Sequence, residues 1–148
     1  MVVFCGFVLF QFFGNSTRGF LETRSMFLWW VSDWFNFEGE TTHGPLILIL
    51  SGWILWRNIK IATPGSNQSR FLLGIFLVFG GLTLHFIGYL VQQTRLSIFG
   101  FLLFVNGAAY ILGGKRWGKA ITFPCILMVF SVHWTVIAHE IGYILRLG

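Results

Sequence analysis

The sequence predicts an all-α fold, a multi-pass bundle of transmembrane helices, and three observations lead to this prediction. First, 55% of the 148 residues are apolar and only 10% are charged, whereas an ordinary soluble domain carries about 25% charged residues. Second, several apolar runs approach the ~20 residues with which an α-helix crosses a bilayer. Third, the charged residues fall between those runs. A soluble enzyme and a disordered chain are therefore excluded, and the partner that this composition requires is a lipid bilayer.

We expect a single integral membrane domain over residues 1–148, with four spans and a shorter fifth at the N-terminus. The N-terminal run, 2–14, is short for a span, but it lacks the basic start and the cleavage site of a signal peptide. The four longer spans are predicted at 45–61, 71–91, 96–114 and 120–138. Pro45 suits a first helical turn, because the N–H that proline lacks would have no partner there.

The basic residues indicate how the chain is oriented. Two connections between spans hold six of the ten, namely Arg57, Lys60, Arg70, Lys115, Arg116 and Lys119. Cytoplasmic loops are enriched in Lys and Arg, so we expect these connections inside the cell, with segment 15–44, Arg95 and the C-terminus outside. Arg18 and Arg24 oppose this orientation. Because the net charge of +5 belongs to loops between spans, we expect no nucleic-acid partner.

The segment 26–37, MFLWWVSDWFNF, is too polar at Ser32, Asp33 and Asn36 to cross a membrane. It contains three Trp and three Phe residues, and such rings are enriched at the headgroup region of a bilayer. We therefore interpret the segment as an interfacial aromatic anchor. A substrate-binding aromatic surface is the alternative.

The two cysteines, Cys5 and Cys125, both lie inside apolar runs. Buried thiols of this kind usually behave as small hydrophobic groups, and nothing in their positions supports a disulfide. A catalytic cysteine needs a base or a cation beside it to hold the thiolate. Since Cys125 lies five residues into the predicted last span, on its cytoplasmic side, and the histidines lie elsewhere, we expect neither thiol to be catalytic.

The four histidines all fall in the outer half of the predicted topology, at His43, His85, His133 and His139, the last followed by Glu140. Ionisable groups within spans often mark function, so a site for haem or a metal is one interpretation. His133 and His139 are six residues apart and do not share a helix face as an i, i+4 pair does. Hydrogen bonding across helices is the favoured interpretation, and we expect no cofactor and no metal.

Glycine is abundant, with 18 residues. Gly80, Gly81 and Gly88 fall in one predicted span, and Gly100 and Gly107 in the next. Small residues let the backbones of membrane helices approach closely. We therefore expect these glycines to allow close packing of helices within the bundle, with oligomerisation as the alternative.

Two motifs carry a family resemblance. The first is Thr42-His43-Gly44, which precedes a span that ends in Trp56-Arg57. The second is Gly114-Lys115-Arg116 leading to Phe123-Pro124. In this order and separation, over about residues 26–132, they resemble the exosortase/archaeosortase family of multi-pass membrane proteins. The residues that match its motifs are Thr42, His43, Gly44, Phe123 and Pro124.

The resemblance implies a cysteine transpeptidase or protease of the bacterial inner membrane that cleaves C-terminal sorting signals of exported proteins. The family's nucleophile belongs to an Ala-x-x-Cys-Ser-Gly-like motif, which this sequence lacks. No catalytic residue is therefore assigned, and whether the chain is an enzyme stays open. We expect a truncated or degenerate member, whose partners are exported proteins with sorting signals and a second chain that supplies the missing half. The alternatives are an accessory or structural membrane subunit without chemistry and a histidine-based haem or metal protein.

Overall fold

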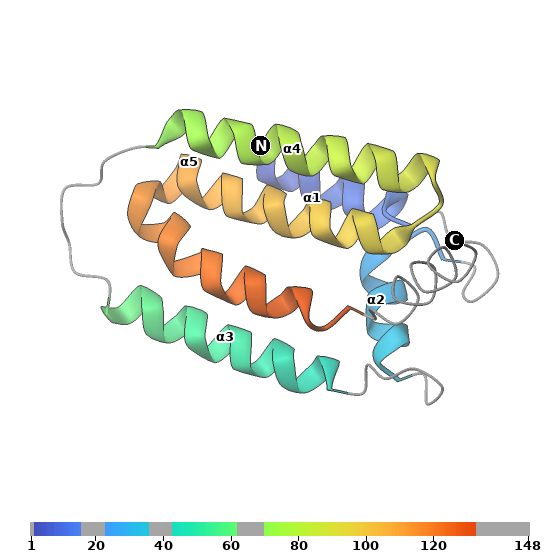
Figure 1. Ribbon diagram of the computed structural model, residues 1–148, viewed down its shortest axis with the longest axis horizontal. Coiled ribbons are helices and arrows are strands. Elements are labelled where there is room, and N and C mark those ends of the chain that lie inside the picture. Colours follow the sequence, from blue (N-terminus) through green and yellow to red (C-terminus); the bar gives the residue numbers. More distant parts are fainter. Residues whose placement is uncertain (1, 16–22, 36–42, 62–69, 133–148) are drawn as a thin grey trace, which may run out of the picture.

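The computed structural model describes residues 2–15, 23–35, 43–61 and 70–132 of the chain. Every element in these ranges is an α-helix, which confirms the all-helical prediction. The helices are α1 (Val2–Phe13), α2 (Met26–Trp34), α3 (Gly44–Ile61), α4 (Phe71–Leu90) and α5 (Thr94–Val129) (Figure 1). Two of the described helices, α4 and α5, are long and apolar enough to cross a membrane. The expected four spans with a shorter fifth go beyond these two helices and stay a prediction.

Helix α5 is folded back on itself at Gly114. This residue has φ 63° and ψ −161°, a left-handed conformation that glycine adopts without the steric cost that other residues meet. The first arm (residues 94–113) packs against α4, and the second arm (residues 115–129) returns beside α3 (Figure 1). The helix resumes at Lys115 and ends at Val129, earlier at both ends than the predicted span 120–138, of which residues 133–138 lie outside the described residues.

The close packing expected from the glycines is present between α4 and the first arm of α5. A Cβ atom built on Gly81 would lie 2.5 Å from the Gly100 carbonyl oxygen, and one on Gly107 would lie 2.7 Å from that of Gly74. The backbones therefore touch directly, which confirms the predicted close approach. Gly80 is the exception, since a Cβ atom there would meet nothing within 4 Å.

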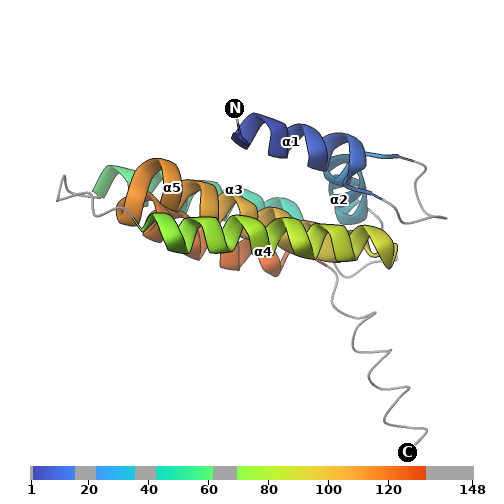
Figure 2. The same cartoon turned by 90° about the horizontal axis from the view of Figure 1, so that it is seen from above.

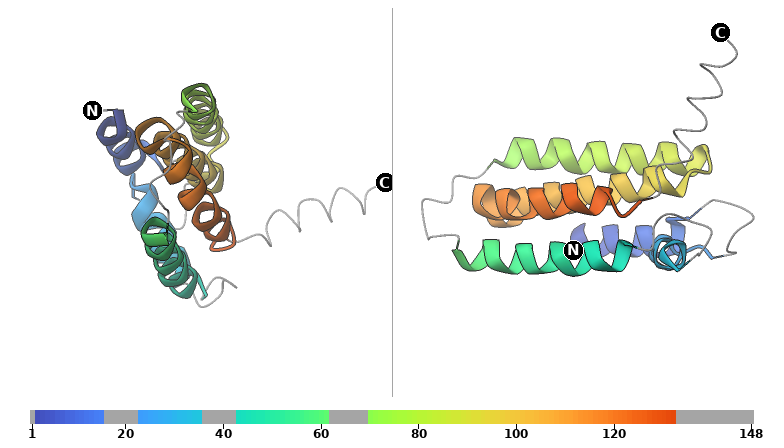
Figure 3. Two further views of the ribbon diagram at one scale, coloured as in Figure 1. Left: turned by 90° about the vertical axis from the view of Figure 1, so that its left-hand side faces the viewer. Right: turned by 60° about the horizontal axis from the view of Figure 1, so that its bottom comes forward.

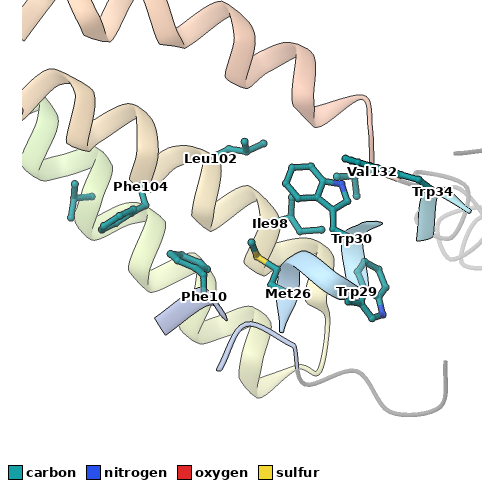
Figure 4. Packing of buried hydrophobic residues seen from close by; sticks show 10 residues of the cluster. Phe10, Met26, Trp29, Trp30, Trp34, Ile98, Leu102, Phe104 and Val132 are labelled. Atoms are coloured by element: carbon teal, nitrogen blue, oxygen red, sulfur yellow. The ribbon is translucent and has the colours of Figure 1, made fainter. Parts of the chain in front are cut away.

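Helix α2 lies across one end of the bundle, and its tryptophans point inward. Trp29, Trp30 and Trp34 are 4–5% exposed and join a core cluster with Phe10, Ile98, Leu102, Phe104 and Val132 (Figure 4). The sequence suggested that these rings would anchor in lipid headgroups. They lie in the protein core instead, because positions 26, 30 and 34 are four residues apart and share the inner face of the helix.

Helix α1 packs beside the α4–α5 pair, with its C-terminal end near α2 (Figure 2). Phe10 is fully buried, and its ring centroid lies 5.2 Å from that of Phe101 and 5.9 Å from that of Phe104. Viewed along the bundle, the two arms of α5 separate α4 from α3 (Figure 3). The second arm of α5 is consequently the element that α3 packs against.

Candidate functional site

The two ends of the bundle differ in chemistry. At one end, the start of α3 and residues 130–132 lie close to α2 (Figure 1); we call this the α2 end. At the other, α3 finishes, α4 begins and α5 turns at Gly114, and we call this the basic end. Its basic side chains are Arg57, Lys60, Arg70, Lys115, Arg116 and Lys119. The described motif residues, His43, Gly44, Phe123 and Pro124, lie at or between these two ends.

At the α2 end, His43 and Trp34 bind the end of α5. The His43 Nε2–H donates to the Phe130 carbonyl oxygen at 3.1 Å, and the Trp34 Nε1–H donates to that of Ser131 at 3.1 Å. A carbonyl oxygen can only accept, so Nε2 carries the imidazole proton in this contact. Carbonyl groups at the end of a helix have no partner within the helix. His43 therefore joins α3 to the end of α5, and Trp34 joins α2 to it.

The space at position 44 explains why a glycine follows the histidine of the motif. A Cβ atom at Gly44 would lie 2.2 Å from Cδ1 of Trp34. Glycine is therefore needed for the indole ring to lie flat against the start of α3 while its N–H reaches Ser131. Thr42, the first residue of the motif, lies outside the described residues.

The Phe-Pro motif is connected to α3 through a residue that the sequence did not single out. Pro124 has no N–H, so the Ala120 carbonyl oxygen lacks the donor that an α-helix would supply four residues later. The Asn58 side chain fills this gap, because its Nδ2–H donates to the Ala120 oxygen at 3.2 Å. Phe123 is 54% exposed and points away from the bundle. The sequence did contain a signal for this contact, because Asn58 places a polar amide side chain directly after Arg57 within an apolar helix.

A second contact at the basic end joins the same two elements. The Arg116 Nη2–H donates to the Ile59 carbonyl oxygen at 3.4 Å, close to the end of α3. Helix α3 is therefore attached to the second arm of α5 at both ends, by hydrogen bonds between residues 57 to 87 positions apart in the chain. The two matched motifs build one joint.

His85 is buried in α4 near the α2 end, where it contacts Ser97 of α5 and Phe10 of α1. Its Nδ1 atom lies 3.1 Å from the Ser97 hydroxyl, and its ring centroid lies 4.6 Å from that of Phe10. His43 has a different partner, Phe130. His133, His139 and Glu140 lie outside the described residues. Within the described ranges no three His, Cys, Asp or Glu side chains come together as metal ligands.

Arg95 lies at the α2 end, at the start of α5. Its guanidinium carbon is 5.9 Å from the centre of the Trp29 ring, a cation–π distance. Its Nε atom is buried and has no hydrogen-bond partner in the described part of the chain. Beside it, the Thr94 hydroxyl donates to Asn15, whose amide donates in turn to the Thr23 carbonyl oxygen at 2.6 Å. This polar network fixes the end of α1 to the start of α5.

Among the described residues, neither cysteine has a base or a cation as a hydrogen-bond partner. Cys5 is exposed on α1, and Cys125 is half-buried against the core cluster. Neither thiol makes a hydrogen bond within the described residues. The sequence placed Cys125 close to the cytoplasmic end of its span. Because the helix resumes at Lys115, the thiol is instead ten residues, or ~15 Å, along the second arm.

Comparison with protein families identifies a family that the chain matches. The family model described as transmembrane exosortase matches residues 29–147, which include all of α3, α4 and α5 and most of α2. Comparison with curated proteins found no match. Comparison with solved structures found no match either.

Proposed function

The chain belongs to the transmembrane exosortase family, and on that premise we propose that it is an exosortase-like, multi-pass protein of the bacterial inner membrane. We propose further that its α2 end holds the C-terminal sorting signal of an exported protein. The observation that carries this proposal is the joint between the two matched motifs. His43 and Gly44 take part in contacts that hold α2, α3 and the end of α5 together at the α2 end. The Asn58 side chain, which binds the Ala120 carbonyl oxygen that Pro124 leaves without a donor, joins α3 to the same arm of α5 nearer the basic end.

Helix lengths support four spans and a shorter fifth. At ~1.5 Å per residue, α4 is ~30 Å long and α3 is ~27 Å long, close to the ~30 Å hydrocarbon core. A straight α5 would be ~54 Å long, far more than one crossing requires. The break at Gly114 divides it into a first arm of ~30 Å, which can cross, and a second arm of ~22 Å over residues 115–129; the predicted span 120–138 extends beyond the described residues. Helix α1, at ~18 Å, enters the bilayer only part of the way.

Charge supports the orientation. The basic end carries six Lys and Arg side chains, and such residues are retained on the cytoplasmic side. The α2 end then faces outward, where the sorting signals of exported proteins become accessible. Leu28 and Val31 of α2, and Phe35 directly after the helix, are each more than 40% exposed. An apolar segment of a substrate can pack against such side chains.

The family's activity is cysteine-dependent cleavage or transpeptidation of the sorting signal. A thiolate requires an adjacent cation or base, whereas Cys125 packs against apolar side chains. We therefore propose that the described part of the chain binds the signal, and that the nucleophile comes from outside it, for example from a second chain. The same observation favours the alternative of an accessory subunit without chemistry.

Site-specific photo-crosslinking tests the proposal. A photoreactive residue replaces Phe35 at the α2 end or Leu112 near the basic end, which are 64% and 74% exposed. Each protein, in a lipid nanodisc that leaves both faces accessible, is irradiated with a peptide carrying a C-terminal sorting signal. We expect adducts at position 35 and not at 112. Equal adducts would indicate simple partition of an apolar peptide, and their absence at both positions would favour the accessory subunit.

A further inference from the structure

We propose that the basic end is a binding site for the phosphate headgroups of anionic phospholipids. This inference uses the membrane location alone and does not depend on recognition of a sorting signal. The site is assembled from the last turn of α3, the start of α4 and the turn of α5 at Gly114 (Figure 1). Three segments distant in the sequence thus contribute cations to one end of the bundle.

Hydrogen bonds show that these segments are adjacent. Arg116 binds the carbonyl group of Ile59, the residue next to Lys60. Asn58, next to Arg57, binds the carbonyl group of Ala120, which follows Lys119. Arg57 and Lys60 of α3 therefore lie at the same level of the bundle as Arg116 and Lys119 of the second arm of α5.

The start of α4 reaches the same level. A Cβ atom at Gly74 would lie 2.6 Å from the Ile111 side chain, so the first turn of α4 is beside the end of the first arm of α5. Arg70 precedes this turn as its N-cap residue, and the Arg70 side chain makes no capping hydrogen bond to the N–H groups of the turn. Uncapped N–H groups at a helix start favour an anion and add to the charge of the side chains.

No carboxylate within the described residues neutralises this end. The one Asp or Glu in the described ranges is Asp33, on α2 at the opposite end. Arg57, Lys60, Arg70, Arg116 and Lys119 are all exposed. Their counter-ions must therefore come from outside the described part of the chain.

The aromatic neighbours of these cations favour a lipid over a soluble anion. The Lys60 Nζ atom lies 3.9 Å from the centre of the Trp56 ring, and the Arg57 guanidinium carbon lies 5.7 Å from that of Trp53. Both rings are more than half exposed. Exposed tryptophans at the end of an apolar helix are typical of the headgroup region of a bilayer. The cations are thus held at the depth where phospholipid phosphates lie.

Lipid binding to the purified chain, in a non-ionic detergent and measured by native mass spectrometry, tests the proposal. The probes are phosphatidylglycerol and phosphatidylcholine with identical acyl chains. The variants are Lys60→Gln, Lys119→Gln and the double variant, with Arg24→Gln as a matched control that removes one exposed cation near the α2 end. We expect phosphatidylglycerol to bind more tightly than phosphatidylcholine. Each single substitution should lower its affinity about fivefold and the double substitution about 25-fold.

Three further results complete the test. Arg24→Gln should change the affinity less than twofold, and Lys60→Arg or Lys119→Arg should restore it, since charge and not the fold is at issue. An excess of free glycerol phosphate should not displace the lipid. Any of three results would overturn the proposal: a loss of phosphatidylglycerol affinity in Arg24→Gln as large as in the Lys variants, equal affinities for the two lipids, or displacement of the lipid by glycerol phosphate.

Discussion

The glycine face between α4 and α5 makes opposite predictions for two adjacent residues, Gly80 and Gly81. A Cβ atom at Gly81 would lie 2.5 Å from the Gly100 carbonyl oxygen and 2.8 Å from the Phe104 amide nitrogen. The first distance is about 0.9 Å short of ordinary contact. Both opposing atoms belong to the backbone, so no side-chain rotation relieves the clash and the helices must separate. Gly81→Ala should therefore destabilise the bundle by about 3 kcal/mol, the upper end of the usual range for overpacking.

At Gly80 the added methyl group meets open space. Gly80→Ala should consequently stabilise α4 by about 0.5–1 kcal/mol, because alanine loses less conformational entropy than glycine in a helix. The free energies of unfolding of the two variants should thus differ by roughly 3–4 kcal/mol. Unfolding by SDS titration in mixed micelles, followed by circular dichroism, measures this difference. Similar stabilities for the two variants would refute the close contact between α4 and α5.

Two further predictions concern the joint between α3 and the second arm of α5. Asn58→Leu leaves the Ala120 carbonyl oxygen without its donor and should cost about 1–3 kcal/mol of unfolding free energy. In a Pro124→Ala background the N–H of Ala at position 124 supplies a donor to the Ala120 carbonyl oxygen. Asn58→Leu should therefore cost at least 0.5 kcal/mol less unfolding free energy there than in the native background. Additive effects of the two substitutions would contradict the contact. Gly44→Ala should displace the facing indole ring, shift the tryptophan fluorescence and destabilise the protein by about 1–3 kcal/mol. Gly52→Ala, on the same helix and facing open space, should do neither, and equal effects of the two alanines would count against the joint.

Much of the helical arrangement follows from local patterns in the sequence. Apolar runs predict the helices because a backbone in lipid must satisfy its own hydrogen bonds. Glycines predict close packing because small residues let helix backbones touch. Gly74, Gly81 and Gly88 also share a face at seven-residue spacing, about two helical turns. That spacing is visible in the sequence and identifies the contact surface more sharply than single pairs do.

The contacts at the motifs could not be predicted in the same way, because each depends on a partner far along the chain. Asn58 matters only because Pro124 withholds a donor 66 residues later and the fold brings the two helices together. The inward tryptophans of α2 are a second example. A segment rich in tryptophan is equally consistent with a lipid interface and with a protein core. Trp34 packs against Gly44, and this contact places the segment in the core.

The central claim is that the chain crosses the inner membrane with its α2 end outside and its basic end inside. Labelling of single cysteines by a membrane-impermeant thiol reagent in intact cells tests this most directly. Both native cysteines are first replaced, by Cys5→Ala and Cys125→Ala. A single cysteine is then introduced at one of two exposed positions, by Gln93→Cys at the turn between α4 and α5 or by Lys119→Cys at the basic end. The account predicts that the protein with Gln93→Cys is labelled in intact cells and that the protein with Lys119→Cys is labelled only after permeabilisation. Labelling of Lys119→Cys in intact cells, with protection of Gln93→Cys, would contradict it.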